Sequence, residues 1–291
     1  TRLQGDWSSD VCSSDLFQTQ YISDMVKTNG YWLRSVRDLH KELSNMKLKV
    51  LSSGSHGNCY IISSQTGCLV LEAGLPWNKI LHGLDYDTSK VIGCLISHSH
   101  MDHAKAAKEV MAAGIDTYMS KQTAETLGLN SHRLCILEPK KQCNIGDFII
   151  MPFEAEHDAD GALGFLIQNK KTGEKLLYLT DSYYCKYKFR GLNYIMIECN
   201  YCKDILDRNI EAGLIDEAMK RRLLESHMSL EHCKQFLKAN DLSQCQKIIL
   251  IHLSEGNSDE KRMVREIEQL TGIETVAASE GLEIELNMLP Y

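Results

Sequence analysis

Three histidines and an aspartate lie within six consecutive residues, His98 to His103, directly after the apolar stretch 91–96. Imidazole and carboxylate side chains together bind Zn, Mn or Fe. The i, i+2 spacing of His98 and His100 lets an extended loop turn both rings toward one ion. Asp102 and His103 are adjacent, point differently and could serve a second ion. A lone histidine is usually a surface or core side chain, but this cluster at the end of a predicted strand indicates a metal site.

The motif H-x-H-x-D-H resembles the defining signature of the metallo-β-lactamase-fold hydrolases, and the resemblance spans about residues 48–286. It implies further ligands downstream, and three strand-like stretches are followed by matching residues: His157, Asp181 and His252. By this correspondence two divalent ions, Zn or Mn, would be bound: one by His98, His100 and His157, the other by Asp102, His103 and His252, with Asp181 bridging them.

Three further segments, 51–60, 226–229 and 252–254, resemble the YycJ/WalJ-like phosphodiesterase and nuclease subgroup, and they echo the ribonuclease Z and PhnP-like branches. Glu72 stands where the family usually has an Asp after a hydrophobic strand. The resemblance gives this position a role in supporting the metal loop, not in ligation. The glycines of the loop 53–58 could expose amides to a phosphate or simply make a tight turn between strands.

The implied chemistry is phosphodiester hydrolysis, because two ions about 3.5–4 Å apart generate a nucleophile near neutral pH and stabilise the developing negative charge. The predicted catalytic residues are Asp102, His227 and Glu198. His227 resembles an additional histidine of the phosphodiesterase branch that would protonate the leaving oxygen, and Glu198 could orient it. A loop-capping or surface role is the alternative for His227.

Three functions remain open. The first is a nuclease acting on DNA or RNA. The second keeps the fold but hydrolyses a small molecule, such as a cyclic phosphodiester, a thioester or a lactone. The third is a noncatalytic metal-binding regulatory module, against which the complete ligand set argues. Basic groups at 186–190 and 220–222 could line a nucleic-acid path, although the sequence favours a solvated helix face for them.

Composition favours an enzyme of the cytoplasm. The 291 residues, 43% of them hydrophobic, can bury the core of one large domain. The odd number of cysteines, eleven, argues for free thiols in a reducing compartment. Neither a membrane-spanning apolar run nor a signal-peptide pattern is present in the sequence, so no membrane partner is expected. The net charge of -7 opposes nonspecific binding of polyanions, but bound divalent ions would reverse the sign of the local field.

The first 45 residues read as a non-native or disordered leader. Residues 1–16 resemble translated sequencing-adapter read-through, a helix is expected around 31–43, and Met46 reads as a natural start. The metallo-β-lactamase-fold domain is therefore expected to span 46–291.

Alternating short strands and helices predict an α/β (α+β) protein, which the resemblance makes a four-layer αββα sandwich. Strands are expected near 47–52, 58–64, 67–72, 92–97, 133–137, 147–154, 163–168, 175–180, 194–198, 247–252 and 282–286. Helices are expected near 76–83, 103–113, 121–127, 203–224, 229–239 and 259–270.

Overall fold

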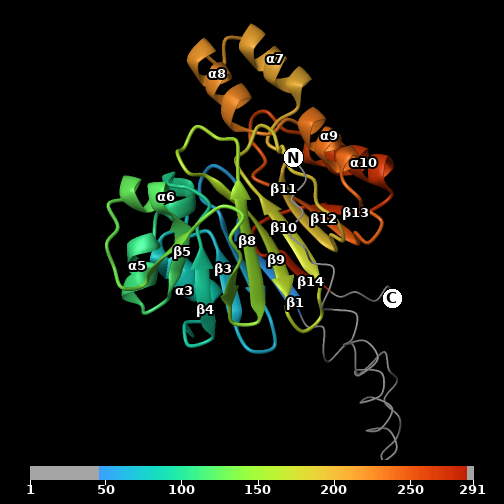
Figure 1. Ribbon diagram of the computed structural model, residues 1–291. Coiled ribbons are helices and arrows are strands. Elements are labelled where there is room, and N and C mark those ends of the chain that lie inside the picture. The colour runs from blue at the N-terminus through green and yellow to red at the C-terminus, as the bar shows by residue number, and fades with distance from the viewer. Residues whose placement is uncertain (1–45, 287–291) are drawn as a thin grey trace, which may run out of the picture.

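The computed structural model describes residues 46–286, so the prediction of a leader over residues 1–45 lies outside the described part of the chain. Two seven-stranded sheets form the centre of the molecule (Figure 1). The first has the order β14-β1-β2-β3-β4-β5-β6. Its strands are β1 (Met46–Ser52), β2 (Cys59–Ser63), β3 (Cys68–Leu71), β4 (Val91–Leu95), β5 (Thr117–Ser120), β6 (Leu134–Leu137) and β14 (Glu283–Leu286).

The second sheet has the order β13-β12-β11-β10-β9-β8-β7. Its strands are β7 (Cys143–Ile145), β8 (Phe148–Glu154), β9 (Leu163–Asn169), β10 (Lys175–Leu179), β11 (Tyr194–Glu198), β12 (Lys247–Ile251) and β13 (Glu274–Ala277). The helices are α3 (Trp77–Gly83), α4 (Met101–Ala104), α5 (Ala107–Ala112), α6 (Lys121–Thr126), α7 (Lys203–Glu211), α8 (Glu217–Ser226), α9 (Leu230–Ala239) and α10 (Glu260–Thr271).

The alternation of side chains along each strand builds the layers. On β10, Leu176 and Tyr178 pack in the core between the two sheets, while Leu177 and Leu179 point the other way and pack with residues of α9 and α10. The first sheet is likewise covered on its outer face by α3, α5 and α6 (Figure 1). Three apolar clusters therefore separate four layers, and the predicted αββα sandwich is confirmed.

Parallel pairing brings the chemically important residues to one edge. Strands β3 to β6 run parallel to one another, and so do β10 to β13. Because the carboxyl ends of parallel strands meet at the same edge, the residues that follow β3, β4, β10 and β12 lie close together. Three of these residues have positive φ, an unusual backbone conformation for side chains other than glycine: Glu72 (63°), Asp181 (41°) and His252 (54°).

All eleven expected strands form, but two expected helices are interrupted. The helix predicted over 203–224 is two helices, α7 and α8, because Gly213 takes φ +69° and the side chain of Asp216 then caps a new helix by accepting from Met219 N at 2.7 Å. The helix predicted over 103–113 divides into α4 and α5, since Ala106 N donates to Ala73 O instead of continuing the helical ladder. The short strands β5, β7 and β13 were not predicted.

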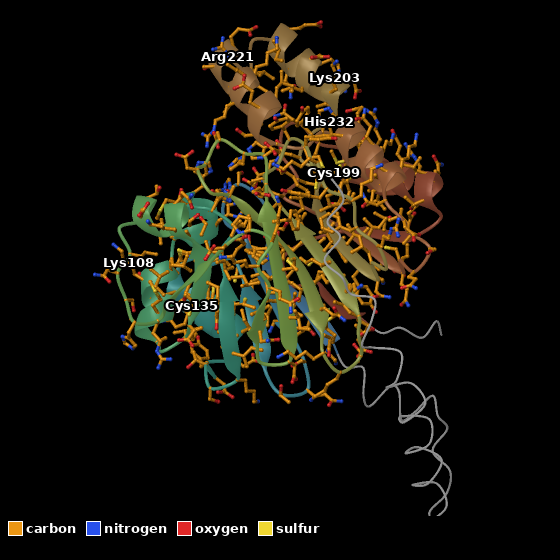
Figure 2. The ribbon with its side chains drawn as sticks, viewed as in Figure 1. Lys108, Cys135, Cys199, Lys203, Arg221 and His232 are labelled. Carbon is orange, nitrogen blue, oxygen red and sulfur yellow. The ribbon has the colours of Figure 1, made fainter. Side chains whose placement is uncertain are left out.

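The helices α7 and α8 form a hairpin that projects beyond the end of the second sheet (Figure 1). Lys203 and Arg221 mark its two helices in Figure 2. Among residues 46–286, no helix combines the length and the apolar character that crossing a bilayer requires.

Candidate metal centre

Three imidazole nitrogens converge at the carboxyl end of β4. Nδ1 of His100 lies 3.2 Å from Nε2 of His98 and 3.1 Å from Nε2 of His157. Oδ2 of Asp181 lies 3.7 Å from the His98 nitrogen and 3.8 Å from the His157 nitrogen. Four ligands placed tetrahedrally around one zinc ion are about 3.3 Å apart. The donor atoms therefore fit a metal ion without rearrangement of the chain.

A second set of donor atoms lies beside the first. Oδ2 of Asp102 is 3.4 Å from Nε2 of His103 and 3.3 Å from Nε2 of His252. The same two nitrogens lie 3.4 Å and 3.6 Å from Oδ1 of Asp181. These spacings again match the ligand shell of one ion, and all the donor atoms of each set lie within 4.8 Å of one another.

Asp181 joins the two sets. Its Oδ1 faces the set with His103 and His252, and its Oδ2 faces the set with His98 and His157. The carboxylate is buried. Burial raises its pKa, but the imidazoles of His252, His103 and His98 outweigh that effect and hold the pKa well below its usual range. Asp181 is thus an anion, as a bridging ligand must be.

The two sets differ in their protonation when no metal is bound. Burial, reinforced by the neighbouring His103 imidazole, holds the pKa of His98 well below its usual range, and burial also lowers the pKa of His157. Burial opposes the charge on His252 as well, but Asp181, Asp102 and Glu198 outweigh it and raise its pKa to about 10. The rings of His98 and His157 are therefore neutral, whereas His252 must release a proton before the second set binds a metal.

The outer nitrogen of most rings is held by a second residue. Nδ1 of His98 lies 2.9 Å from Oγ of Ser97, and Nδ1 of His157 lies 3.0 Å from the carbonyl oxygen of Ser226. Nδ1 of His252 lies 3.2 Å from Nδ2 of Asn200, which also donates to the His252 carbonyl at 2.8 Å. Such contacts orient imidazole ligands and fix which nitrogen faces the metal.

Glu72 supports the loop that carries the motif. Its buried carboxylate accepts a hydrogen bond from Ser97 N at 3.2 Å and another from the Tyr178 hydroxyl at 3.0 Å. Oε2 lies 3.6 Å from Nδ1 of His103, a buried nitrogen that has no hydrogen-bond partner. The longer Glu side chain therefore reaches the motif loop from the end of β3.

The glycine-rich loop 53–58 packs against the same motif. Asn58 N donates to Asp102 O at 2.7 Å, and Nδ2 of Asn58 lies 3.1 Å from Nε2 of His103. The amides of Gly54 and Gly57 are bonded within the loop, at 2.9 Å to Asn58 Oδ1 and 3.1 Å to Gly54 O. These three amides are committed to protein acceptors, so the tight-turn interpretation describes them better than phosphate binding.

Gly74 lets the backbone of the motif approach this loop. A Cβ atom at Gly74 would lie 1.7 Å from Asp102 O and 2.8 Å from Asn58 N. No side chain fits at this position without displacement of the chain segment that carries Asp102 and His103.

His227 and Glu198 form a pair at the edge of the second set. Nδ1 of His227 lies 2.7 Å from Oε1 of Glu198, and the His227 ring stacks on His252 with centroids 5.4 Å apart. Oε2 of Glu198 accepts from Ser182 N and from Met228 N, each at 3.0 Å. Burial opposes the charge on His227, but Glu198 outweighs it and raises the pKa of the imidazole.

Every residue predicted from the sequence as a ligand or catalytic group thus lies in one cluster. The contacts that hold the rings were not foreseen, among them those of Asn58 in the loop before β2 and of Asn200 after β11. Asn58 stands in the glycine-rich loop that the sequence had marked, and Asn200 follows the strand that ends at Glu198, but nothing local distinguishes them from turn residues.

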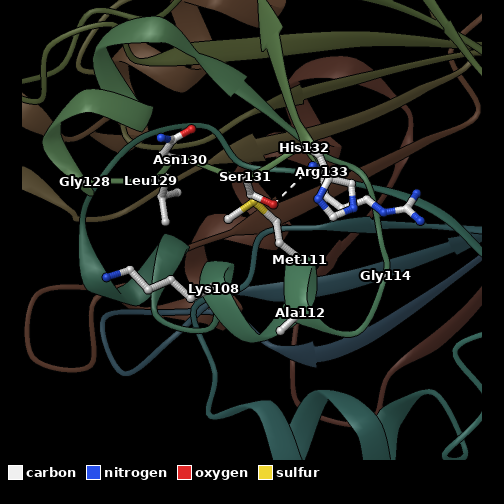
Figure 3. Close-up of a pocket in the computed structure, with 10 residues that line it drawn as sticks. All are labelled: Lys108, Met111, Ala112, Gly114, Gly128, Leu129, Asn130, Ser131, His132 and Arg133. Carbon is white, nitrogen blue, oxygen red and sulfur yellow. Dashed lines mark hydrogen bonds between the residues drawn. The ribbon is translucent and has the colours of Figure 1, made fainter.

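The surface pocket in Figure 3 lies elsewhere. Its volume is about 440 Å³, and its lining combines α5 with the turn that precedes β6. Since β6 runs toward the metal cluster, the start of this strand lies at the opposite edge of the sheet. None of the candidate ligands lines this pocket.

The fold and the donor set together define a metallo-hydrolase of the β-lactamase type. The model of the beta-lactamase superfamily domain matches residues 78–253, and the chain belongs to this family. It is a metal-dependent hydrolase. Two curated relatives are exodeoxyribonucleases: WalJ of Streptococcus pneumoniae serotype 2 is 26% identical over 80% of this chain and 89% of its own length, and YycJ of Bacillus anthracis is 23% identical over 82% and 94%.

Solved structures share the fold at lower identity. The metallo-beta-lactamase fold protein YhfI of Bacillus subtilis superimposes with a TM-score of 0.64 at 15% identity, over 83% of this chain and 99% of its own. The short form of human tRNase Z superimposes with a TM-score of 0.58 at 14% identity, over 83% and 99%. A diphosphatase from the PhnP family gives 0.59 at 14% identity, over 83% and 97%.

Proposed function

We propose that this protein is a dinuclear-metal-dependent phosphodiesterase that cleaves nucleic acid. One observation carries the proposal: the two oxygens of Asp181 face two adjacent sets of donor atoms, one toward each. Such an arrangement suits a pair of closely spaced ions, which is the recurrent solution for in-line displacement at phosphorus. The names of the WalJ and YycJ relatives support nucleic acid as the substrate.

The ions would be held by the residues of the two sets: His98, His100 and His157 for one, Asp102, His103 and His252 for the other, and Asp181 for both. Zn and Mn both accept a shell of imidazole and carboxylate. When bound, such a pair supplies an activated water and stabilises the negative charge that develops on the phosphoryl oxygens.

The chain itself supplies the proton for the leaving group. The bond to Glu198 engages Nδ1 of His227, so Nε2 is the nitrogen that remains to meet a substrate. Because Glu198 raises the pKa of His227, the ring is protonated over a wider pH range than a free imidazole. Asp102 contributes by orienting the second set, since its carboxylate lies between His103 and His252.

Free thiols support a location in the cytoplasm. The described residues include ten free cysteines. Such a population of unpaired thiols is typical of proteins in a reducing compartment.

The test compares three substrates after the protein is loaded with Zn or Mn: an oligonucleotide with 5′-phosphate ends, a cyclic nucleotide and a thioester. The proposal predicts cleavage of the oligonucleotide at the highest kcat/KM. Preference for the cyclic nucleotide or the thioester would assign the same centre to a small-molecule hydrolase. A metal-loaded protein that cleaves none of the three would be a metal-binding module.

A further inference from the structure

Several of the exposed large apolar side chains stand next to the candidate ligands in the chain. In the described part of the chain, eight large apolar side chains are exposed: Tyr86, Met101, Ile136, Tyr183, Tyr184, Leu214, Met219 and Leu224. Met101 stands inside the metal motif, and Tyr183 and Tyr184 follow Asp181 by two and three residues. Met219 and Leu224 belong to α8, whose last residue, Ser226, contacts His157. Met101, Tyr183, Tyr184 and Leu224 therefore offer apolar surface to a ligand that approaches the centre.

The backbone that presents the two tyrosines is fixed from two sides. Tyr183 N donates to Glu156 O at 3.1 Å, and Glu156 N donates to Ser182 Oγ at 2.9 Å. The Ser182 hydroxyl donates to Tyr184 O at 2.8 Å, and Ser182 N is held by the buried Glu198. The segment 182–184 is thus anchored to the loop that carries His157. Tyr183 and Tyr184 are 37% and 51% exposed, so part of each side chain is accessible while the backbone that carries it is held in place.

Cations flank this segment. Nζ of Lys186 lies 2.9 Å from Oε1 of Glu156, and Nε of Arg222 lies 3.4 Å from Oδ2 of Asp158. Both cationic side chains remain exposed, at 44% and 63%. Lys186 and Arg222 each pair with a carboxylate that would otherwise repel a phosphate group near the centre. Tyrosines beside cations are the combination with which proteins hold the bases and backbone of a single strand.

We propose that Tyr183 and Tyr184 form a stacking platform for the bases next to the scissile phosphate, so that the protein acts on strands whose bases are unpaired there. The platform rests on the proposed nuclease function and gives that function its substrate class: single-stranded or frayed ends. A paired base keeps its faces covered by its neighbours in the duplex, whereas an unpaired base offers a face to each ring.

The test uses the metal-loaded full chain with Tyr183→Ala and Tyr184→Ala. On a single-stranded oligonucleotide each variant should lose about 5- to 150-fold in kcat/KM, the range for one lost base-aromatic stack. Tyr183→Phe and Tyr184→Phe keep the ring and should stay within about twofold of wild type. Tyr86→Ala is the matched control, because Tyr86 is exposed before β4, at the edge opposite the centre.

A second substrate separates stacking from damage to the centre. It is the same oligonucleotide without the bases that flank the scissile phosphate. Wild type should be slowed on it to the level that the double variant Tyr183→Ala/Tyr184→Ala shows on the intact oligonucleotide, and the double variant should lose nothing further, because each base and its ring act as one coupled pair. If the double variant is slowed on this substrate by the same factor as wild type, or if it has lost bound metal by elemental analysis, the tyrosines have a structural role and the platform is overturned.

The outcomes distinguish this inference from the function on which it rests. If wild type cleaves no oligonucleotide, the nuclease function fails, and the platform fails with it. If wild type cleaves the oligonucleotide and the alanine variants cleave it equally well, or if wild type prefers a fully paired blunt duplex, the platform alone is wrong.

Discussion

The Nδ1 atom of His227 lies 2.7 Å from Oε1 of Glu198, while the His227 ring stacks on the candidate ligand His252. The two histidines are neighbours, but His252 is buried whereas His227 is partly exposed, and their contacts differ. His252 points Nε2 at the carboxylates of Asp102 and Asp181, whereas His227 directs Nδ1 to Glu198. We therefore expect a ligand role for His252 and a proton-transfer role for His227.

Substitution of His227 separates these roles. His227→Ala should retain the bound metal of wild type and slow cleavage of an unactivated phosphodiester by roughly 10²–10⁴-fold. A p-nitrophenolate leaving group needs no proton, so its release should suffer much less. His252→Ala, the matched comparison, should lose metal and activity together. Loss of metal in the His227 variant, with retention in the His252 variant, would exchange the two assignments.

Glu198 controls the pH range in which His227 is protonated. Because Glu198 raises the pKa of His227, removal of its charge in Glu198→Gln should lower that pKa. A general acid acts in its protonated form, so activity should be lost at a lower pH on the alkaline side of the profile. The pH dependence of kcat measures this shift. An unchanged alkaline limb would mean that His227 is not the group that titrates.

Asp181→Ala should weaken the binding of metal at both sets of ligands, because Asp181 places one oxygen beside each. Elemental analysis after gel filtration measures the metal content. Asp160→Ala is a suitable control, since Asp160 is an exposed carboxylate close to His157 in sequence. A variant that loses metal from one set only would contradict the bridging role.

The second set should bind metal with release of protons. In the metal-free protein the pKa of His252 is about 10, so the ring is protonated at neutral pH and metal must displace the proton. Affinity of this set should therefore rise with pH between about 6.5 and 8.5, by roughly tenfold per pH unit for each proton released. Calorimetry in two buffers of different ionisation enthalpy counts the protons. If metal binds to both sets and no proton is released, the predicted charge on His252 is wrong.

Gly74→Ala should disturb the metal loop without touching a ligand. The new Cβ would meet Asp102 O at 1.7 Å, so the backbone must move, at a cost of about 1–3 kcal/mol in the free energy of unfolding. Thermal unfolding should show the loss of stability and a metal titration the loss of affinity. Gly256→Ala, at a glycine with open space around its Cβ position, should change neither. If Gly74→Ala and Gly256→Ala have the same stability and metal affinity, the close approach of Gly74 to Asp102 O is refuted.

Much of this centre could be predicted from the sequence because its ligands follow strands. An apolar stretch that ends in His or Asp indicates both the strand and the edge at which the ligand lies, as for Asp181 after β10 and His252 after β12. The pairing of Glu198 with His227 could be foreseen on the same basis, since each follows a recognisable element.

The remaining features depend on contacts between distant parts of the chain. Asn58 contacts the ring of His103, and Asn200 contacts the ring of His252; both histidines are distant from these asparagines in the sequence. The break between α7 and α8 needs the left-handed Gly213, because the apolar period alone continues through it. Strands β5, β7 and β13 are three or four residues long, and pairing with a neighbour rather than composition makes them strands.

The most direct test of the central claim is a metal titration followed by activity. Protein stripped of metal with a chelator is given increasing equivalents of Mn or Zn, and the rate of oligonucleotide cleavage is measured at each step. Two adjacent ligand sets joined by Asp181 predict a rate that rises until two equivalents are bound and then stays constant. A rate that reaches its maximum at one equivalent, or cleavage that persists in the stripped protein, would contradict a dinuclear centre.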